Sequence, residues 1–366
     1  MTLNILDTNS KRVKILSHIK EDQNYNIDLI KEPMAHSSLD IIKRKSSSKN
    51  LYKLSYFDDF STHNTTGIKL ESVLPNWDNW VGNKFRYGKD IIDLNGKALI
   101  LAQCFNNNYG HVLHDHIQYI FKLLEIDFDF IFIPYSEVLL NILSTFKIEL
   151  NKKFVIINPG EEIHITVDEL HIENRSTMPF KEKKFIKKFK KHLDKFLSSE
   201  SNSQKTIIYY KRKSSDVHNA RVMNIKNEEA ILNLIKDSIK KYNRKEKFVI
   251  YDGLSCGERM SYIDQAKLFY SAKFVIGAHG SGLANTIFIN PKNKSSVCEF
   301  TSGTSKLVWG NKPFLKNYNT AYCDYLDKFT NYNLIPFTKE SSTSETLINL
   351  KDMQSFLDLY FSNDKS

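Results

Sequence analysis

The feature that most constrains the fold of this chain is an alternation of short apolar runs with amphipathic stretches, which begins near residue 97. The apolar runs have the length of strands, and the amphipathic stretches repeat their apolar residues with the period of a helix. The predicted strands are 97–104, 128–134, 153–158, 205–210, 247–253, 273–277 and 295–300. Strands that alternate with helices in this way form parallel sheets, so the sequence predicts an α/β fold.

The predicted elements fall into two groups along the chain. The chain has 366 residues, which is more than one hydrophobic core usually accommodates. The serine-rich segment SSESNSQ, which ends at residue 204, interrupts the alternation and is typical of a linker. We therefore predict an N-terminal α/β domain over residues 1–200, a Rossmann-like domain over 201–330 and a tail helix within 331–366. Two such domains would face a cleft, whereas residues 1–95 carry no pattern that predicts their structure.

Composition indicates the kind of partner and compartment. The net charge of +10 favours an anionic partner: a nucleic acid, a membrane surface or a phosphorylated small molecule. The four cysteines are scattered without metal-ligand spacing, as is typical of thiols in a reducing compartment. The N-terminal segment lacks the pattern of a signal peptide, and no apolar run reaches the roughly 18 residues of a membrane span. We therefore expect a cytoplasmic protein.

A glycine-rich loop around a histidine follows one predicted strand. In FVIGAHGSGLANTIFINP, Gly277, Gly280 and Gly282 surround His279, although the whole chain has only 13 glycines. A tight turn needs one or two glycines, whereas a phosphate group lying against the backbone explains all three. Between a strand and a helix, backbone N–H groups and the helix dipole also favour an anion. We therefore predict an anion site here, with His279 as a further donor.

The same loop departs from two familiar motifs and has a plainer explanation. GSGLAN has asparagine where the dinucleotide fingerprint has its last glycine. Ser281 does not fit the nucleophile position of a GxSxG motif, because His279 stands where the first glycine belongs. Ser281 and Asn285 are candidate ligand contacts, but Asn285 is equally explained as a hydrogen-bonded structural amide. A simple strand-to-helix turn would also account for part of the pattern.

Charged residues at other predicted strand ends extend the candidate site. Arg212 and Arg221 follow the strand at 205–210, and two arginines can neutralise a diphosphate leaving group without a metal ion. Glu299 ends the strand at 295–300, where a carboxylate can accept hydrogen bonds from ribose hydroxyls. The alternatives are a solvated basic loop and a surface charge.

Three segments of the chain carry a family resemblance. The block from Ala272 to Pro291, followed by VCEF with Glu299, resembles the glycosyltransferase family 61 signature A-x-x-(I/V)-(I/V)-G-x-H-G-(A/S)-G-L-x-N, then F-x-x-P and a strand ending in glutamate. YKRKSSDVHNARVMNIKNEEA resembles the basic segment of the family, although Lys211 replaces its usual serine. NNYGHVLHDHI is similar to an N-Y-x-H-W segment, with Val112 in place of tryptophan.

The resemblance implies a fold and a reaction class. Members have the two-domain GT-B architecture, invert the anomeric centre and need no catalytic metal. It therefore implies a nucleotide-sugar donor bound by the C-terminal domain, a glycan acceptor on the side of the N-terminal domain, and no cofactor. The expected activity is hexosyl or pentosyl transfer in the synthesis of capsule, O-antigen or another surface polysaccharide.

Inversion requires a general base that takes the proton of the acceptor hydroxyl. In HVLHDHIQYIFKLLE, α-helical spacing predicts that His111, His114, Asp115 and Gln118 share one face, with His116 to the side. We expect Asp115 or His111 to be the base, with His114 beside them. The alternative is a structural cluster of hydrogen-bonded polar groups.

Other functions remain open from these residues. HVLHD fits the HxxxD motif of some acyltransferases, but that reaction leaves the glycine-histidine loop unexplained. The histidines and Asp115 also resemble a partial zinc site, for which the sequence offers no further ligand. A protein of the same fold that binds nucleotides or glycans without catalysis is the non-enzyme alternative.

A basic amphipathic segment, residues 180–197, alternates phenylalanines with lysines. One interpretation is a peripheral helix on the inner face of the membrane, with phenylalanines buried in lipid, near a lipid-linked acceptor. The other is a helix whose apolar stripe packs on the protein core while its lysines face solvent. Nucleic acid is not an expected partner, because no recognisable binding module accompanies the charge.

Overall fold

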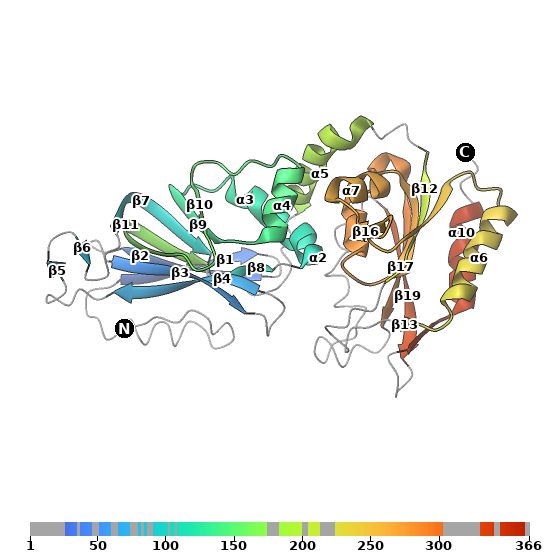
Figure 1. Ribbon diagram of the computed structural model, residues 1–366, viewed down its shortest axis with the longest axis horizontal. Helices are drawn as coiled ribbons and strands as arrows, with labels where there is room; N and C mark the ends of the chain where they lie inside the picture. The colour runs from blue at the N-terminus through green and yellow to red at the C-terminus, as the bar shows by residue number, and fades with distance from the viewer. Residues whose placement is uncertain are drawn as a thin grey trace. The chain divides into compact units, whose positions relative to one another are not determined.

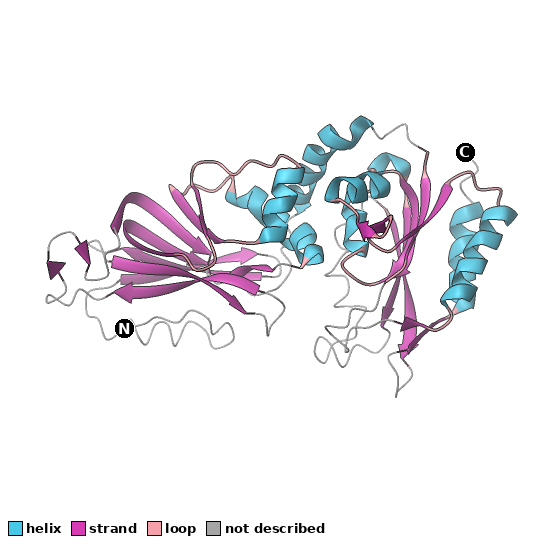
Figure 2. Ribbon diagram, viewed as in Figure 1, coloured by secondary structure: helices cyan, strands magenta, loops and turns pink. Residues whose placement is uncertain are grey.

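The computed structural model describes residues 26–34, 37–45, 51–59, 65–73, 80–81, 84–85, 91–101, 103–106, 108–173, 183–199, 204–212, 224–302, 330–339 and 345–362. Contacts between residues divide the chain into two compact units, Met1–Phe185 and Ile186–Ser366. Figure 1 labels most of the helices and strands of each unit, and Figure 2 colours them by type.

The first unit is built on one mixed sheet. Its strands lie in the order β10 (Phe154–Ile157), β9 (Phe130–Pro134), β7 (Ile91–Leu101), β11 (Glu162–Glu173), β3 (Leu51–Asp59), β4 (Thr65–Val73) and β8 (Gln103–Asn106), and β2 (Ser37–Lys45) joins β1 (Asn26–Met34) to β11. Pairing is parallel from β10 through β9 and β7 to β11. It is antiparallel among β1, β2, β3, β4, β8 and their partners.

Helices cover one face of the parallel part. The segments α2 (Tyr109–His111), η2 (Val112–His116) and α3 (Ile117–Leu123) precede β9, and α4 (Glu137–Thr145) connects β9 to β10. The path from β7 to β9 to β10 moves in one direction across the sheet, so right-handed crossovers place α3 and α4 on the same face. The buried strand residues Leu99, Ile131 and Ile133 supply the apolar surface for an α/β layer.

The antiparallel strands provide a core on the opposite face. Buried residues of β3 and β4 pack in one cluster with residues of β7, β9, β10 and β11, although β3 and β4 are not hydrogen-bonded to β9 or β10. The sheet therefore curls back on itself. The prediction of an α/β fold is confirmed, but here strands from the N-terminal region, rather than a second helical layer, complete the core.

The second unit contains a doubly wound sheet. Its order is β13 (Asn224–Ile225), β20 (Glu345–Ile348), β19 (Asn331–Lys339), β18 (Ser296–Ser302), β17 (Ala272–Ala278), β12 (Thr206–Tyr210) and β14 (Lys247–Tyr251). All pairs are parallel except β19 with β20. The continuous apolar strands predicted in this half of the sequence are confirmed, because β12 and β17 are buried along their whole length.

Two helical layers cover this second sheet (Figure 1). On one face, α6 (Glu228–Lys241) lies beside α10 (Leu350–Ser362), and their apolar residues form one core with Ile207, Phe274 and Phe300. On the other face, α7 (Tyr262–Tyr270) packs beside the 3₁₀ helix η5 (Leu283–Phe288). Because strand residues alternate between faces, Tyr210, Gly277 and Glu299 point to the side of α7 and η5.

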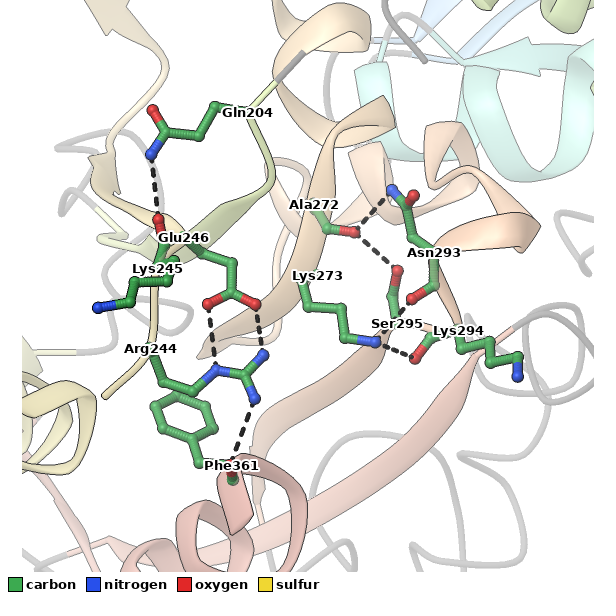
Figure 3. Close-up of polar contacts among 10 residues, drawn as sticks. All are labelled: Gln204, Arg244, Lys245, Glu246, Ala272, Lys273, Asn293, Lys294, Ser295 and Phe361. Atoms are coloured by element: carbon green, nitrogen blue, oxygen red, sulfur yellow. Dashed lines mark hydrogen bonds and ion pairs between the residues drawn. The ribbon is translucent and has the colours of Figure 1, made fainter. Parts of the chain in front are cut away.

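Polar contacts fix the amino-terminal end of the second sheet (Figure 3). Glu246 accepts hydrogen bonds from Nε of Arg244 at 3.1 Å and from its Nη2, and both side chains are buried. The guanidinium carbon of Arg244 lies 5.0 Å from the ring centroid of Phe274 and 5.7 Å from that of Phe361. Nζ of Lys273 donates to the carbonyl of Asn293 at 2.9 Å. These contacts all lie at the amino-terminal ends of the strands. The carboxyl ends of the strands lie at the opposite end of the sheet.

The helix α5 (Lys183–Leu197) corrects the predicted domain boundary. From Ile186 onward it belongs to the second unit, and the ring of Phe189 lies 6.5 Å from that of Phe288 in η5. The boundary therefore falls at residue 185 rather than 200. The segment 331–366 is also more than a tail, because β19 and β20 are strands of the second sheet and α10 covers one face of it.

The surface of α5 decides between the two interpretations of the basic segment. Its apolar residues Phe185, Ile186, Phe189 and Leu193 are buried and Phe196 is half-buried, so Phe185 and Phe189 do not form a lipid-facing stripe. Its exposed side chains include Lys184, Lys187, Lys188, Lys191 and Lys195. Among the described residues, no helix has both the length and the apolar character needed to cross a bilayer.

Candidate functional site

The topology of the second sheet selects one place for a ligand. In chain order its main parallel strands are β12, β14, β17, β18 and β19, but in space they lie as β14, β12, β17, β18 and β19. The chain leaves β12 towards the face of α6 and leaves β17 towards the face of η5. Ligands of doubly wound sheets bind outside the carboxyl ends of the two strands at such a reversal. The loops that follow Tyr210 and Ala278 therefore form the candidate site.

The sheet register brings several predicted residues together at this edge. Tyr210 pairs with Gly277, and Gly277 pairs in turn with Glu299 on β18. Arg212 lies two residues beyond β12, and His279 is the first residue beyond β17. Residues that are far apart in sequence thus occupy adjacent positions.

His279 is held by a buried carboxylate. Its Nδ1 lies 2.7 Å from Oε1 of Glu299, and its backbone N–H donates to the carbonyl of Phe300 at 3.0 Å. The Glu299 side chain is 0% exposed, whereas that of His279 is 37% exposed. The hydroxyl of Tyr332 donates to the other carboxylate oxygen, Oε2, at 2.5 Å. The structure therefore places Glu299 behind His279 and corrects both its predicted contact with ribose and its alternative as a surface charge.

Arg212 lies against the same loop. Its Nη1 donates to the backbone carbonyl of His279 at 2.5 Å, and its side chain is half-buried. A guanidinium group held against the loop that carries the imidazole adds positive charge at this end of the sheet, as expected for an anion site. Arg221, the second predicted arginine, lies outside the described residues.

The glycines have a structural cause that the sequence did not reveal. A Cβ atom on Gly277 would lie 2.7 Å from both Cβ and the carbonyl oxygen of Tyr210, and one on Gly282 would lie 2.4 Å from Cε2 of the same ring. At Gly280 the nearest atom, the Tyr210 hydroxyl oxygen, would be 3.3 Å away. None of the three glycines has a positive φ. The packing of Tyr210 therefore explains two of the glycines without any ligand, which corrects the argument from phosphate approach.

Asn285 is a structural residue of the loop. Its side chain is fully buried, and Nδ2 is 3.0 Å from both the Tyr251 hydroxyl and the carbonyl oxygen of Gly282 and 3.1 Å from Oε1 of Gln265. The alternative of a satisfied amide is therefore correct, and the predicted ligand contact is not, because the amide cannot reach solvent. Burial also raises the pKa of the Tyr251 hydroxyl, so this internal network stays neutral.

The remaining loop positions bear on anion binding to different degrees. Ser281 and Gly282 are half-exposed, whereas Gly280 is buried. The element that follows is a six-residue 3₁₀ helix rather than an α-helix, so its dipole is smaller than the sequence-based prediction assumed. His279, Arg212 and Ser281 are thus the side chains best placed to meet an anion.

The candidate base region of the first unit forms a π-helical turn. Val112–His116 has this conformation, with the Ile117 N–H bonded to the carbonyl of Val112. The altered spacing breaks the single polar face expected from an α-helix. His114 and Gln118 are buried, and Nε2 of Gln118 donates to the His114 carbonyl. His116 is also buried rather than turned to the side.

His111 and Asp115 are left as the candidates for the base. His111 is half-buried, whereas the side chain of Asp115 lies outside the described residues. Among the side chains that the structure does describe, none form a cluster of three or more histidines, cysteines, aspartates or glutamates suited to a metal ion. The assignment of a base therefore remains a prediction.

A doubly wound sheet with a basic, histidine-bearing loop at its reversal belongs to the class of α/β proteins that bind ligands outside the carboxyl ends of their strands. Within that class the chain belongs to the glycosyltransferase 61 family, whose sequence model matches residues 109–298, more than half of the chain. This match spans the π-helical turn, Arg212 and the glycine-histidine loop. Family membership defines the protein as a glycosyltransferase, with a sugar donor and an acceptor as substrates.

Two solved structures show distant likeness. The bacterial iron-containing dodecameric glycosyltransferase TibC from enterotoxigenic E. coli H10407 has 8% sequence identity and a TM-score of 0.30, over 80% of this chain and 81% of its own. A beta-D-glucuronidase from Dictyoglomus thermophilum has 9% identity and a TM-score of 0.16, over 93% and 68%. No curated protein sequence matches the chain.

Proposed function

We propose that the protein is an inverting, metal-independent glycosyltransferase that moves a sugar from a nucleotide-sugar donor to a hydroxyl group of a glycan acceptor. The observation that carries this proposal is the joint position of His279 and Arg212 at the reversal of the second sheet. The nucleotide diphosphate binds there, in the unit formed by residues 186–366. The first unit supplies the acceptor side and the base, in a GT-B arrangement.

The charge of the leaving group determines what these residues do. As the bond between the anomeric carbon and the donor oxygen breaks, its electron pair passes to the nucleotide diphosphate. Arg212 and His279 stabilise that growing negative charge, with Ser281 as a hydroxyl donor beside them. Arg221 is the second arginine of this proposed site.

The attacking oxygen determines the second half of the mechanism. An acceptor hydroxyl forms the new bond from the opposite side of the anomeric carbon and gives its proton to the base. We assign that role to Asp115 or His111. His114 supports the turn that carries them, in line with its burial.

Surface polysaccharide synthesis, such as that of capsule or O-antigen, is the proposed setting, with a lipid-linked or growing glycan as acceptor and a cytoplasmic location. Any contact with an anionic membrane would use the exposed lysines of α5, since Phe185 and Phe189 are buried. Such a contact would be electrostatic and would weaken as salt is added.

A binding screen followed by a transfer assay tests the function. Thermal stabilisation by one class of nucleotide sugar, and transfer of that sugar to a glycan in the presence of a chelator, is the expected result. Stabilisation only by acyl-coenzyme A would instead indicate an acyltransferase, and donor binding without transfer to any acceptor would indicate a binding protein. Activity that a chelator removes and zinc restores would contradict the metal-independent mechanism.

Substitutions in the first unit test the base. Asp115→Asn or His111→Gln should lower the rate of transfer by about 10²- to 10⁴-fold while donor binding stays unchanged. His116→Gln, at a buried position of the same turn, is the control for local damage. Full transfer activity in both Asp115→Asn and His111→Gln would contradict the assignment of the base to either residue.

A further inference from the structure

We infer that Tyr332 is a positioning residue of the donor site, which acts through Glu299 to fix the tautomer and direction of the His279 imidazole. The inference rests on the proposed function, because it assigns His279 a contact with the donor diphosphate through Nε2. Tyr332 lies on β19, outside the segment that the family model matches. Its role follows from three groups that form one hydrogen-bonded row.

The sheet brings the row together. On β19, Tyr332 pairs with Val297 of β18, two positions before Glu299 and on the same face of the sheet. A tyrosine at this register reaches diagonally along the neighbouring strand, and its hydroxyl donates to Oε2 of Glu299 at 2.5 Å. The opposite carboxylate oxygen, Oε1, lies 2.7 Å from Nδ1 of His279. The two oxygens of one buried carboxylate are thus engaged from two sides.

Burial gives this row its directionality. Glu299 is 0% exposed, so its carboxylate relies on hydrogen bonds from the protein rather than from bulk water. A carboxylate can only accept, so Nδ1 of His279 must carry a proton. The second ring nitrogen, Nε2, is on the far side of the ring, and the imidazole is 37% exposed. Nε2 is therefore the atom that faces a ligand, and because Nδ1 already carries a proton, Nε2 donates to an anion such as a diphosphate when the ring is protonated.

Tyr332 matters because its hydrogen bond to Oε2 restricts the rotation of the Glu299 carboxylate. With its hydroxyl in place, Oε2 is held and Oε1 stays towards His279. Without it, Glu299 is held by one hydrogen bond fewer, so the direction of the imidazole and its Nδ1–H tautomer are less firmly fixed. A diphosphate would then meet a histidine of mixed tautomer and orientation.

A double-mutant cycle with inorganic pyrophosphate as the probe tests this chain of contacts. Tyr332→Phe keeps the ring in place and removes only the hydroxyl. We expect it to weaken pyrophosphate binding about 3- to 10-fold in the otherwise unchanged protein and to have no further effect in a His279→Ala background. An equal loss in both backgrounds, or no loss in either, would overturn the inference.

Isosteric substitutions identify the nitrogen that meets the ligand. His279→Gln places an amide near the position of Nε2, whereas His279→Asn places one near Nδ1. The Gln variant should keep more pyrophosphate affinity than the Asn variant, and the reverse order would overturn the inference. A midpoint of urea unfolding within error of the unsubstituted protein confirms that each variant is folded.

Imidazole ¹⁵N chemical shifts give a readout that does not depend on transfer or binding. With selectively labelled histidine, the His279 signal should report the Nδ1–H tautomer, and Tyr332→Phe should shift it towards a mixture. A pure Nε2–H tautomer in the unsubstituted protein would overturn the positioning role. If pyrophosphate fails to bind while the Nδ1–H tautomer is seen, the proposed donor site fails, but the hydrogen-bonded row is supported.

Discussion

A Cβ atom on Gly282 would lie 2.4 Å from Cε2 of Tyr210, a distance that Cβ contacts in proteins do not reach. Gly282 has no positive φ, so the reason for glycine here is the closeness of the aromatic ring and not backbone conformation. The loop that carries His279 therefore packs directly against Tyr210, the last residue of β12.

Replacing Gly282 tests this contact with Tyr210. Gly282→Ala forces the ring or the loop to move and should lower the free energy of unfolding by about 1–3 kcal/mol. Gly280→Ala meets its nearest atom at 3.3 Å and should cost less. Urea unfolding of both variants, and of Gly282→Ala combined with Tyr210→Leu, measures the effect. The combined variant should lose less than the two single losses added together, and strict additivity would contradict direct contact.

Arg212 provides the matched test of the anion site. Arg212→Ala should weaken pyrophosphate binding by about 10- to 100-fold, because a charge-assisted hydrogen bond is lost. The pyrophosphate affinity of Arg212→Lys should lie between that of the unsubstituted protein and that of Arg212→Ala, because lysine keeps the positive charge but lacks the planar guanidinium group. Calorimetric titration gives these affinities. The control is Lys211→Ala, whose ammonium group pairs with Glu228 at 3.0 Å and should leave pyrophosphate affinity nearly unchanged.

The buried amine of Lys190 should make the free energy of unfolding depend on pH. Its Nζ donates to the carbonyls of Ile287 at 2.8 Å and Ile289 at 3.1 Å, and burial lowers its pKa from 10.5 to about 8. Between these values the unfolded chain binds more protons than the folded one, so its contribution to the free energy of unfolding rises with pH across that window. Below pH 8 the ammonium is charged in both states, and the cost of burying it is fully present.

The expected rise attributable to Lys190 is on the order of 3 kcal/mol from pH 8 to 10.5, measured by urea unfolding at steps across this window. Lys190→Met should remove this rise and also lower stability at high pH, because two carbonyls lose their donor. Lys187→Met on the exposed face of the same helix is the control. An identical pH profile in the unsubstituted protein and in Lys190→Met would show that the buried amine does not titrate in this range.

The pair formed by Arg244 and Glu246 separates stability from ligand binding. Both side chains are buried at the amino-terminal end of the sheet (Figure 3), so removing one leaves an unpaired charge. Glu246→Gln should cost about 3–5 kcal/mol in the free energy of unfolding. The combined change of Arg244→Met and Glu246→Met should cost less, since no charge remains. Pyrophosphate affinity should be unchanged in variants that remain folded, because the candidate site is at the opposite edge.

Much of the second unit could be predicted from the sequence because its information is local. Apolar runs of strand length, alternating with helical periodicity, specify β12, β14, β17 and β18 without knowledge of their neighbours. The first unit could not be predicted as fully. Its strand β1 pairs with β2, and β3 pairs with β4, as neighbours in the chain. The sheet is completed only when β2 and β3 pair with β11 and β4 pairs with β8. These partners come from distant segments, and local periodicity does not specify them.

The candidate site shows the same division. The motif around His279 and the strand-end position of Arg212 are visible in the sequence, and the structure brings these two residues together. The sequence predicts a ribose contact or a surface charge for Glu299 and leaves a ligand contact and a structural amide equally open for Asn285. Both side chains are fully buried, and only this burial distinguishes a structural partner from a ligand contact. Tyr210 and Tyr332 were missed. An aromatic residue opposite a glycine is a usable signal only once the sheet register is known.

By itself the sequence determined the α/β class, the glycosyltransferase signature and the basic residues at the carboxyl ends of the strands. These depend on periodicity and on motifs a few residues long. Only the tertiary structure decided why two of the glycines are required, which oxygen atoms hold His279, and that the π-helical turn buries His114 and Gln118. The physical reason is that packing, register and burial are relations between residues that the chain brings together only when it folds.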